Sequence, residues 1–290
     1  MLPMDKCKAT ASFTLALCLY GTIGWALSYI DLPSEVVVLC RGGIGTLFIL
    51  AVLLCRKRRF DLPAVRANLK WLALSGISLG LNWVLLFAAY RATTVAIATL
   101  CNYMAPVILI IVAPWLLAEK RNPKKICCAA IAVLGVVLVS GVVGGGAQAA
   151  NLRGVALALA AAVGGAALII CNKKMGDVPI FEKASTQLFF STLTALPFVL
   201  INNLGASFHP GALAVGLVIM LGVVHTGIAY CLYFGAIPYL SAQSLAVLGY
   251  VEPAVAVLVS TLIMHEPLSL LGWLGAALII GAAAASELVE

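Results

Sequence analysis

Long apolar stretches, each separated from the next by a few charged or polar residues, make up most of this 290-residue chain. Each is close to the roughly 20 residues that a helix needs to cross a hydrocarbon core of about 30 Å. Because a backbone in lipid must satisfy its own hydrogen bonds, such stretches predict transmembrane helices. We expect ten of them, at residues 11–30, 34–55, 71–90, 95–117, 123–143, 153–171, 181–201, 212–235, 240–264 and 269–286.

The composition agrees with a membrane protein. Hydrophobic residues form 63% of the chain, charged residues 10%, and the mean hydropathy is +1.11. A soluble domain carries about 25% charged residues, so this chain cannot cover a globule with polar surface. The first stretch follows Lys6 and Lys8, but it is longer than the roughly 7–15 apolar residues of a signal peptide and lacks a clear cleavage site. We expect it to remain as the first span of an all-α integral membrane protein.

One passage of the sequence occurs twice. Residues 102–120 have the sequence "NYMAPVILIIVAPWLLAEK", and residues 249–267 have the sequence "GYVEPAVAVLVSTLIMHEP". Four identical residues recur 147 positions apart without a gap, at Tyr103 and Tyr250, Pro106 and Pro253, Val112 and Val259, and Glu119 and Glu266. Each half contains five expected spans, an odd number, so the second half must enter the bilayer from the opposite side. The sequence therefore predicts ten transmembrane helices as two inverted five-helix repeats, at residues 11–143 and 153–286.

Inverted repeats favour a secondary transporter, although channels can also contain them. The paired prolines lie inside their spans, where each removes a backbone hydrogen bond and frees the carbonyl of Asn102 or Gly249. Broken helices of this kind border the binding sites of transporters, and they also occur as simple packing kinks. The spacing Gly76-x-x-x-Gly80 predicts a close approach between helices.

The paired glutamates have a different interpretation. Glu119 and Glu266 stand at the C-terminal ends of their spans, where the helix dipole disfavours a carboxylate. Asn122 and Ser269, each three residues later, are good N-caps for the following helix. We expect each glutamate to face the N-terminus of that next helix and to clamp a tight turn, which is a structural role.

The net charge of +7 is unevenly distributed. With the N-terminus in the cytoplasm, ten spans place fifteen Lys and Arg residues on the cytoplasmic side and only Arg91 and Arg153 outside, with Arg41 inside a span. Basic loops resist translocation, so this asymmetry predicts a multi-pass protein of the cell (plasma) membrane with both termini cytoplasmic. Attraction to the anionic inner leaflet explains the positive charge, and no nucleic-acid partner is expected.

The cysteines and histidines suggest no cofactor chemistry. The nine cysteines are an odd number, none falls in an expected outside loop, and no CxxC pair occurs. Free thiols therefore fit better than a disulfide framework. The pair His265-Glu266 is not followed by a second histidine four residues after the first, as a zinc protease would require. We expect no metal, no cofactor and no enzymatic activity.

Two longer segments share one order of features: a short turn, a span with a mid-helix proline, a terminal glutamate and a final glycine- and alanine-rich span. They are "LLFAAYRATTVAIATLCNYMAPVILIIVAPWLLAEKRNPKKICCAAIAVLGVVLV" and "YFGAIPYLSAQSLAVLGYVEPAVAVLVSTLIMHEPLSLLGWLGAALIIGA". Each resembles the end of an EamA repeat of the drug/metabolite transporter superfamily, and Pro33 with Arg41 resembles the opening of that family's first repeat. The resemblance covers nearly the whole chain. It implies ten helices around a central cavity and export of small metabolites, amino acids or drugs.

Ionisable groups inside a membrane are costly and are usually functional or paired. Glu252 lies about 12 residues into its span, hence about 18 Å deep and near the midplane. It can serve transport or form a structural salt bridge with Arg41, whose long side chain can also reach outward to water. His225 can be functional or can hydrogen-bond a neighbouring helix. Further candidates for a cavity lining, each also typical of packing or interface anchoring, are Trp25, Asn82, Trp83, Asn102, Tyr103, Tyr230 and Tyr250.

The two repeats differ beside their prolines, because Ala105 in the first corresponds to Glu252 in the second. A midplane carboxyl group can hold a proton or bind a substrate amine, and together with Arg41 it can bracket an amino-acid zwitterion. We expect a secondary transporter in the lipid bilayer, a monomer or homodimer, that exports a small-molecule substrate (an amino acid, amine or drug-like compound) by alternating access coupled to protons. Uptake by the same fold, a channel and a lipid flippase are the alternatives.

Overall fold

The computed structural model describes residues 5–57, 59–117, 123–139, 152–203, 208–240 and 248–288, which are helical and contain no β-strand. The first half contains α1 (Lys6–Gly21), α2 (Ile23–Ser28), α3 (Ser34–Cys55), α4 (Leu62–Ala67), α5 (Leu69–Ala92), α6 (Val95–Asn102), α7 (Ala105–Leu116) and α8 (Pro123–Val139). The second half contains α9 (Leu152–Lys174), α10 (Ile180–Asn202), α11 (Ala212–Gly222), the π-helix η2 (Val223–Ile228), α12 (Ala229–Ala236), the short 3-10 helix η3 (Ile237–Tyr239), α14 (Val251–Leu258), the π-helix η4 (Val259–Ile263) and α15 (Leu270–Leu288).

Most of these helices are membrane-spanning by length and composition. Seven helical segments are long and apolar enough to cross a bilayer, and shorter apolar helices cover Ile126–Val139, Val251–Ile263 and Leu270–Ala282. The multi-pass, all-helical class predicted from the sequence is therefore confirmed over the described residues. The number of ten spans and the inversion of the second half stay predictions.

Helix α4 was not predicted from the hydrophobic pattern. It is only six residues long and lies in the polar connection between two spans. The carboxylate of Asp61 accepts a hydrogen bond from the backbone nitrogen of Ala64 at 3.1 Å, and Pro63 lies in the first turn. A capping acid followed by a proline favours a helix start, but so short a helix leaves no hydrophobic period to detect.

Both paired prolines lie at real interruptions of their spans. Helix α6 ends at Asn102, a turn follows, and α7 begins at Ala105 with Pro106 in its first turn. In the second half α14 begins at Val251, and Pro253 occupies its first turn. A proline has no backbone N–H, so it fits the first turn of a new helix better than the interior of an old one. The structure thus contains two helix breaks, at residues 102–106 and 249–253, rather than two kinked continuous helices.

Two further irregularities escaped the sequence analysis. The first span is interrupted at Thr22, between α1 and α2, and the eighth span changes to a π-helix around His225. Each occurs without a proline, and the neighbouring glycines Gly21 and Gly222 are no clear signal, because Gly76 and Gly80 lie inside an uninterrupted helix. Side chains on the two irregular turns contact each other, as described below.

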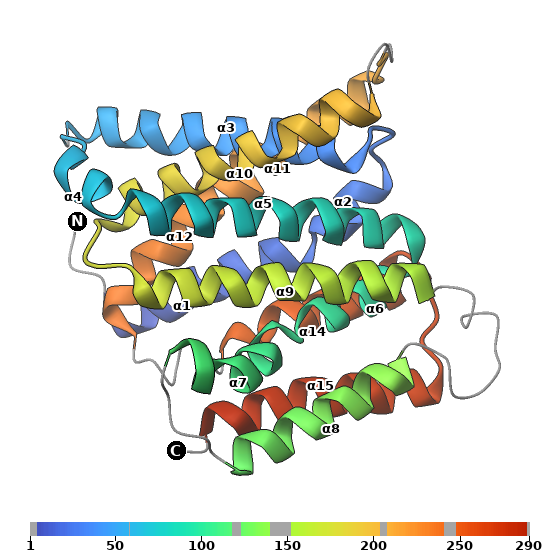
Figure 1. Ribbon diagram of the computed structural model, residues 1–290. Helices are drawn as coiled ribbons and strands as arrows, with labels where there is room; N and C mark the ends of the chain where they lie inside the picture. The colour runs from blue at the N-terminus through green and yellow to red at the C-terminus, as the bar shows by residue number, and fades with distance from the viewer. Residues whose placement is uncertain are drawn as a thin grey trace.

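The two halves pack against each other throughout the bundle (Figure 1). Helix α5 lies along α9, α3 along α10, and α8 along α15, so each pair joins one helix from each half. The pair formed by α8 and α15 stands at one edge of the bundle, and α3 stands at the other. The region between them is bounded by α1, α5, α9 and the two helix breaks.

Small residues permit the close contact between α5 and α10. A methyl group added at Gly76 would lie 2.6 Å from the carbonyl oxygen of Gln187, and one added at Gly80 would lie 2.8 Å from that of Ser191. Neither distance is tolerable for a real side chain. The close approach predicted from the Gly76-x-x-x-Gly80 spacing is therefore confirmed.

Candidate functional site

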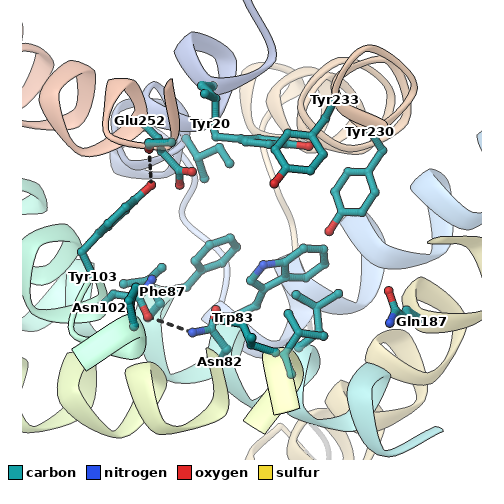
Figure 2. Close-up of a pocket in the computed structure, with 18 of the residues that line it drawn as sticks. Tyr20, Asn82, Trp83, Phe87, Asn102, Tyr103, Gln187, Tyr230, Tyr233 and Glu252 are labelled. Carbon is teal, nitrogen blue, oxygen red and sulfur yellow. Dashed lines mark hydrogen bonds between the residues drawn. The ribbon is translucent and has the colours of Figure 1, made fainter. Parts of the chain in front are cut away.

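A cavity of about 590 Å³ lies where the two helix breaks meet. Its lining combines α1, α3, α5, α7, α9, α10 and α12 with both breaks, so both halves contribute (Figure 2). A volume of this size suits a small molecule. The walls combine aromatic rings with several amide and charged side chains.

The two helix breaks are hydrogen-bonded across the cavity. The hydroxyl of Tyr103, in the first break, donates to the carbonyl oxygen of Gly249 in the second at 3.3 Å. That carbonyl is one of the two that the proline positions were predicted to free. Figure 2 shows the Tyr103 hydroxyl directed toward the turn that carries Glu252. Tyr103 thereby ties one half of the protein to the other at the site.

Glu252 lines the cavity from the first turn of α14. A helix N-terminus favours a carboxylate through its exposed N–H groups and its dipole. The first span lies directly against this turn, because a methyl group added at Gly21 would be 2.9 Å from the carbonyl oxygen of Glu252. The side chain is half-buried and directed at the cavity, among Tyr20 and Tyr103 (Figure 2).

Arg41 also lines the cavity, but its charge is already accommodated by the protein. Its side chain is only 2% exposed, and its Nε donates to the hydroxyl of Thr226 at 2.7 Å. The guanidinium carbon lies 4.2 Å from the centre of the Trp83 ring and 5.6 Å from that of Phe87. An aromatic face attracts a cation, so these rings stabilise the buried charge.

Two of the arrangements considered for Arg41 from the sequence are therefore wrong, whereas its pairing with Glu252 around a zwitterion stays a prediction. Its guanidinium is not in salt-bridge contact with Glu252, and its side chain does not extend outward to water. The Trp83 ring lies over the guanidinium, and Thr226 accepts from its Nε, so both contacts hold the Arg41 side chain inside the bundle. Glu252 is left as an acid in the cavity without a paired cation.

His225 lies outside the cavity lining. It is 4% exposed on the π-helix η2, with its Nε2 3.0 Å from the hydroxyl of Thr22 and its Nδ1 3.5 Å from the carbonyl oxygen of Met220. The first contact joins the two irregular turns of the first and eighth spans. His225 thus takes the arrangement in which it hydrogen-bonds a neighbouring helix.

Asn82 and Asn102 form a polar junction on one wall. The amide nitrogen of Asn82 donates to the side-chain oxygen of Asn102 at 2.8 Å and to the carbonyl oxygen of Ala161 at 2.7 Å. Both asparagines line the cavity. The junction joins α5, the end of α6 and α9 beside the first helix break.

The remaining sequence candidates divide into two groups. Tyr230, Tyr250 and Pro106 line the cavity, whereas Trp25 and Pro253 do not. Trp25 packs edge-on against Tyr29, with ring centres 5.7 Å apart, and against the hydrophobic core. Pro253 is buried behind Glu252, where it shapes the break without meeting the cavity.

Several lining residues were missed by the sequence analysis. They are Tyr20, Phe87, Tyr90, Asn172, Gln187, Tyr233 and Phe234. The spacing of Tyr230, Tyr233 and Phe234 places them on one helix face, and this signal could have identified that wall. Nothing local distinguishes the others from ordinary packing residues.

Glu266 has a partner that the sequence analysis did not expect. Its carboxylate accepts a hydrogen bond from the backbone nitrogen of Val95 at 3.0 Å and another from the hydroxyl of Ser260. It therefore caps the N-terminus of α6, in the other half, and not the following helix. The following helix has its own cap, because the hydroxyl of Ser269 accepts from the nitrogen of Gly272 at 3.0 Å, as predicted. Glu119 and Asn122 lie outside the described residues.

In the described part of the chain, no group of three or more His, Cys, Asp or Glu side chains could hold a metal ion. Many apolar helices around a polar and aromatic cavity are instead characteristic of a multi-pass membrane transport protein.

The sequence identifies the family directly. It matches the EamA-like transporter family twice, over residues 10–141 and 152–286, and the chain belongs to that family. The uncharacterized transporter YxxF of Bacillus subtilis (strain 168) is 27% identical over 265 residues, covering 89% of this chain and 82% of that protein. The probable terminal-alkyne amino-acid exporter of Streptantibioticus cattleyicolor is 27% identical over 256 residues, covering 87% and 80%.

A protein of known crystal structure has the same fold. It superimposes with a TM-score of 0.67 at 23% sequence identity, and the match covers 97% of each chain. This likeness supports the arrangement of the helices and carries no information about the substrate.

Proposed function

We propose that this protein is a secondary carrier that exports a small metabolite (an amino acid, amine or drug-like compound) by alternating access, coupled to protons. The observation that carries the proposal is the position of Glu252, an acid without a paired cation in an aromatic cavity where both helix breaks meet. A carboxyl group there can exchange a proton when the cavity faces either side, or bind a substrate amine.

The proposed transport cycle uses two five-helix repeats, residues 11–143 and 153–286, inserted in opposite directions. Two inverted halves have two near-equivalent packings, one open to each side of the membrane. The contact between Tyr103 and Gly249 lies between the halves, at the point that must adjust when they move. The resemblance to a probable amino-acid exporter supports export of a molecule with an amine.

The proposed orientation places both termini in the cytoplasm and the protein in the plasma membrane. Single cysteines at Asp31 and His209, both exposed, should react with an impermeant thiol reagent added outside intact cells. Cysteines at Arg59 and Lys124 should react only after permeabilisation. Strong outside labelling at Arg59 would overturn this orientation and the inversion proposed with it.

The central experiment measures flux in liposomes that contain the purified protein. A panel of radiolabelled amino acids and aromatic amines is tested with and without a pH gradient, together with the Glu252→Gln variant. We expect saturable gradient-driven flux and counterflow exchange by the wild type. The variant should fold normally but lose at least about tenfold of the gradient-driven flux, a barrier change of about 1.4 kcal/mol.

The matched control is Glu35→Gln, which makes the same chemical change outside the cavity. Glu35 accepts hydrogen bonds from Asn202 and Asn203, and a glutamine oxygen can still do so. Its flux should match the wild type. If Glu252→Gln also transports like the wild type, Glu252 has no part in the mechanism. Flux that neither saturates nor shows counterflow would indicate a channel.

A further inference from the structure

An amide pair lies at the part of the cavity formed by α9 and α10. Gln187 is 4% exposed, and together with Asn172 it lines the cavity. Figure 2 shows Gln187 and Glu252 on opposite sides of the view, with the rings of Trp83, Phe87 and Tyr230 between them. The role proposed for Glu252, which exchanges a proton or binds a substrate amine, does not involve this amide pair.

The hydrogen bonds fix which way both amides point. The Nε2 of Gln187 donates to the hydroxyl oxygen of Ser75 and to the Oδ1 of Asn172, both at 2.8 Å. The hydroxyl of Ser75 in turn donates to the carbonyl oxygen of Leu72 at 2.9 Å, so it must accept from Gln187. The two N–H groups of Gln187 are therefore both in use.

One acceptor and one donor of the pair remain. Within the described part of the chain, neither the Oε1 of Gln187 nor the Nδ2 of Asn172 has a hydrogen-bond partner, and neither atom is fully enclosed. Figure 2 shows the Gln187 oxygen on the side that faces Tyr230. A ligand that donates to this oxygen and accepts from this nitrogen would form hydrogen bonds that the protein itself does not make, and it gains affinity from them.

The position of Gln187 in the second repeat matches that of Arg41 in the first. Each is the eighth residue of its helix, α10 or α3, and each helix follows an N-capping proline, Pro179 or Pro33. The two repeats therefore place a cation and a neutral amide at equivalent positions. Arg41 is the only Lys or Arg in the described lining, and its charge is held by Trp83 and Thr226.

We propose that Gln187 and Asn172 form a second subsite, which binds an uncharged amide group of the substrate while Glu252 binds its amine. The proposal rests on the transport function proposed for this cavity. An amide both donates and accepts, and so it complements the Gln187 oxygen and the Asn172 nitrogen together. A carboxylate can only accept, so it can use the Asn172 nitrogen but not the Gln187 oxygen. The substrate class is accordingly an amino compound with a neutral amide.

The test compares two probes that differ only in the amide. Phenethylamine and phenylalaninamide both carry an amine and a phenyl ring, and only the second has a carboxamide. Binding to the purified full-length protein is measured from the concentration dependence of the melting temperature. The wild type should bind phenylalaninamide about tenfold more tightly than phenethylamine, as one or two hydrogen bonds allow. It should also prefer phenylalaninamide to phenylalanine.

The variant Gln187→Met keeps the length of the side chain and removes its oxygen. It should bind both amines equally, with the affinity for phenethylamine unchanged. Ser75→Ala is the matched structural control, because Ser75 bonds Gln187 but does not line the cavity. It should retain the preference even if it melts earlier. Should Gln187→Met not fold, Asn172→Ala must reduce the preference severalfold.

An unaltered preference in Gln187→Met, or no preference in the wild type, overturns the subsite. After either result, the proposed carrier function still stands if Glu252→Gln loses phenethylamine binding and the wild type retains gradient-driven flux. If neither amine binds, the subsite is also overturned. The flux experiment then tests separately whether the protein is a carrier.

Discussion

Both helix breaks place a proline in the first turn of the helix that follows, but their surroundings differ. In the first, residues 102–106, Asn102 is bonded to Asn82 and Ala105 is buried at 9% exposure. In the second, residues 249–253, Glu252 stands where Ala105 would be and lines the cavity. The repeated prolines thus mark two breaks, and we propose that the residues that differ between them decide which break carries the chemistry.

Packing explains why the first break cannot hold an acid. A methyl group added at Gly165, on α9, would lie 3.0 Å from the Cβ of Ala105, so α9 fills the space beside that residue. At the second break, a methyl group added at Gly21 of α1 would lie 2.7 Å from the side chain of Val255 and 2.9 Å from the carbonyl oxygen of Glu252, so these close contacts of α1 do not involve the Glu252 side chain. The side chain of Glu252 remains free to point into the cavity. The asymmetry of the site therefore depends on which atoms the neighbouring helix touches.

The most severe test of this comparison is to place an acid in the first break. Ala105→Glu must force a carboxylate between α7 and α9, where it is buried without a cation. We expect a loss of stability of about 3–5 kcal/mol, seen as a large fall in melting temperature and in the yield of folded protein. Ala105→Gln separates size from charge, and it should be destabilised less. A normally folded Ala105→Glu would show that the first break has room for an acid.

A smaller effect is expected from tightening the contact behind Glu252. Gly21→Ala would place its methyl group 2.7 Å from Val255 and 2.9 Å from the Glu252 carbonyl oxygen, so the first span must shift. Overpacking of this kind costs about 1–3 kcal/mol, and we expect a lower melting temperature together with slower flux. Gly216→Ala is the matched control, since a methyl group at Gly216 meets nothing within 4 Å. Equal behaviour of the two variants would contradict the contact.

The apolar helices and the two breaks at the prolines could be predicted from the sequence because their causes are local. Apolar stretches of about 20 residues and prolines within them act at their own positions, and the helices follow. Glu252 was also recognisable, as an acid deep in an apolar stretch. Comparison of the two repeats also drew attention to Glu252, because the first repeat has Ala105 at the equivalent position.

The partners of the polar residues could not be predicted, because they come from distant parts of the chain. Glu266 caps Val95 across 171 positions, and Arg41 binds Thr226 across 185. Nothing near Arg41 indicates that the ring of Trp83 will cover it. Gln187 was missed for another reason: a neutral amide in an apolar stretch attracts less attention than a charge, although its position repeats that of Arg41.

The smallest expected effect concerns the two prolines themselves. Replacing Pro106 or Pro253 with Ala restores an N–H that can bond the carbonyl four residues earlier, which favours a continuous helix through the break. Each variant should fold to a similar yield but transport about three- to tenfold more slowly per folded molecule, a change of about 0.6–1.4 kcal/mol in the barrier. Pro253→Ala should be the slower of the two, because it would also displace Gly249 and Glu252, whereas the first break carries no acid. The measurement is initial flux in liposomes, normalised to the folded protein, for both variants side by side. Flux equal to the wild type in both variants would mean that the breaks are packing features only. A greater loss in Pro106→Ala would mean that the first break, and not the second, matters more for transport.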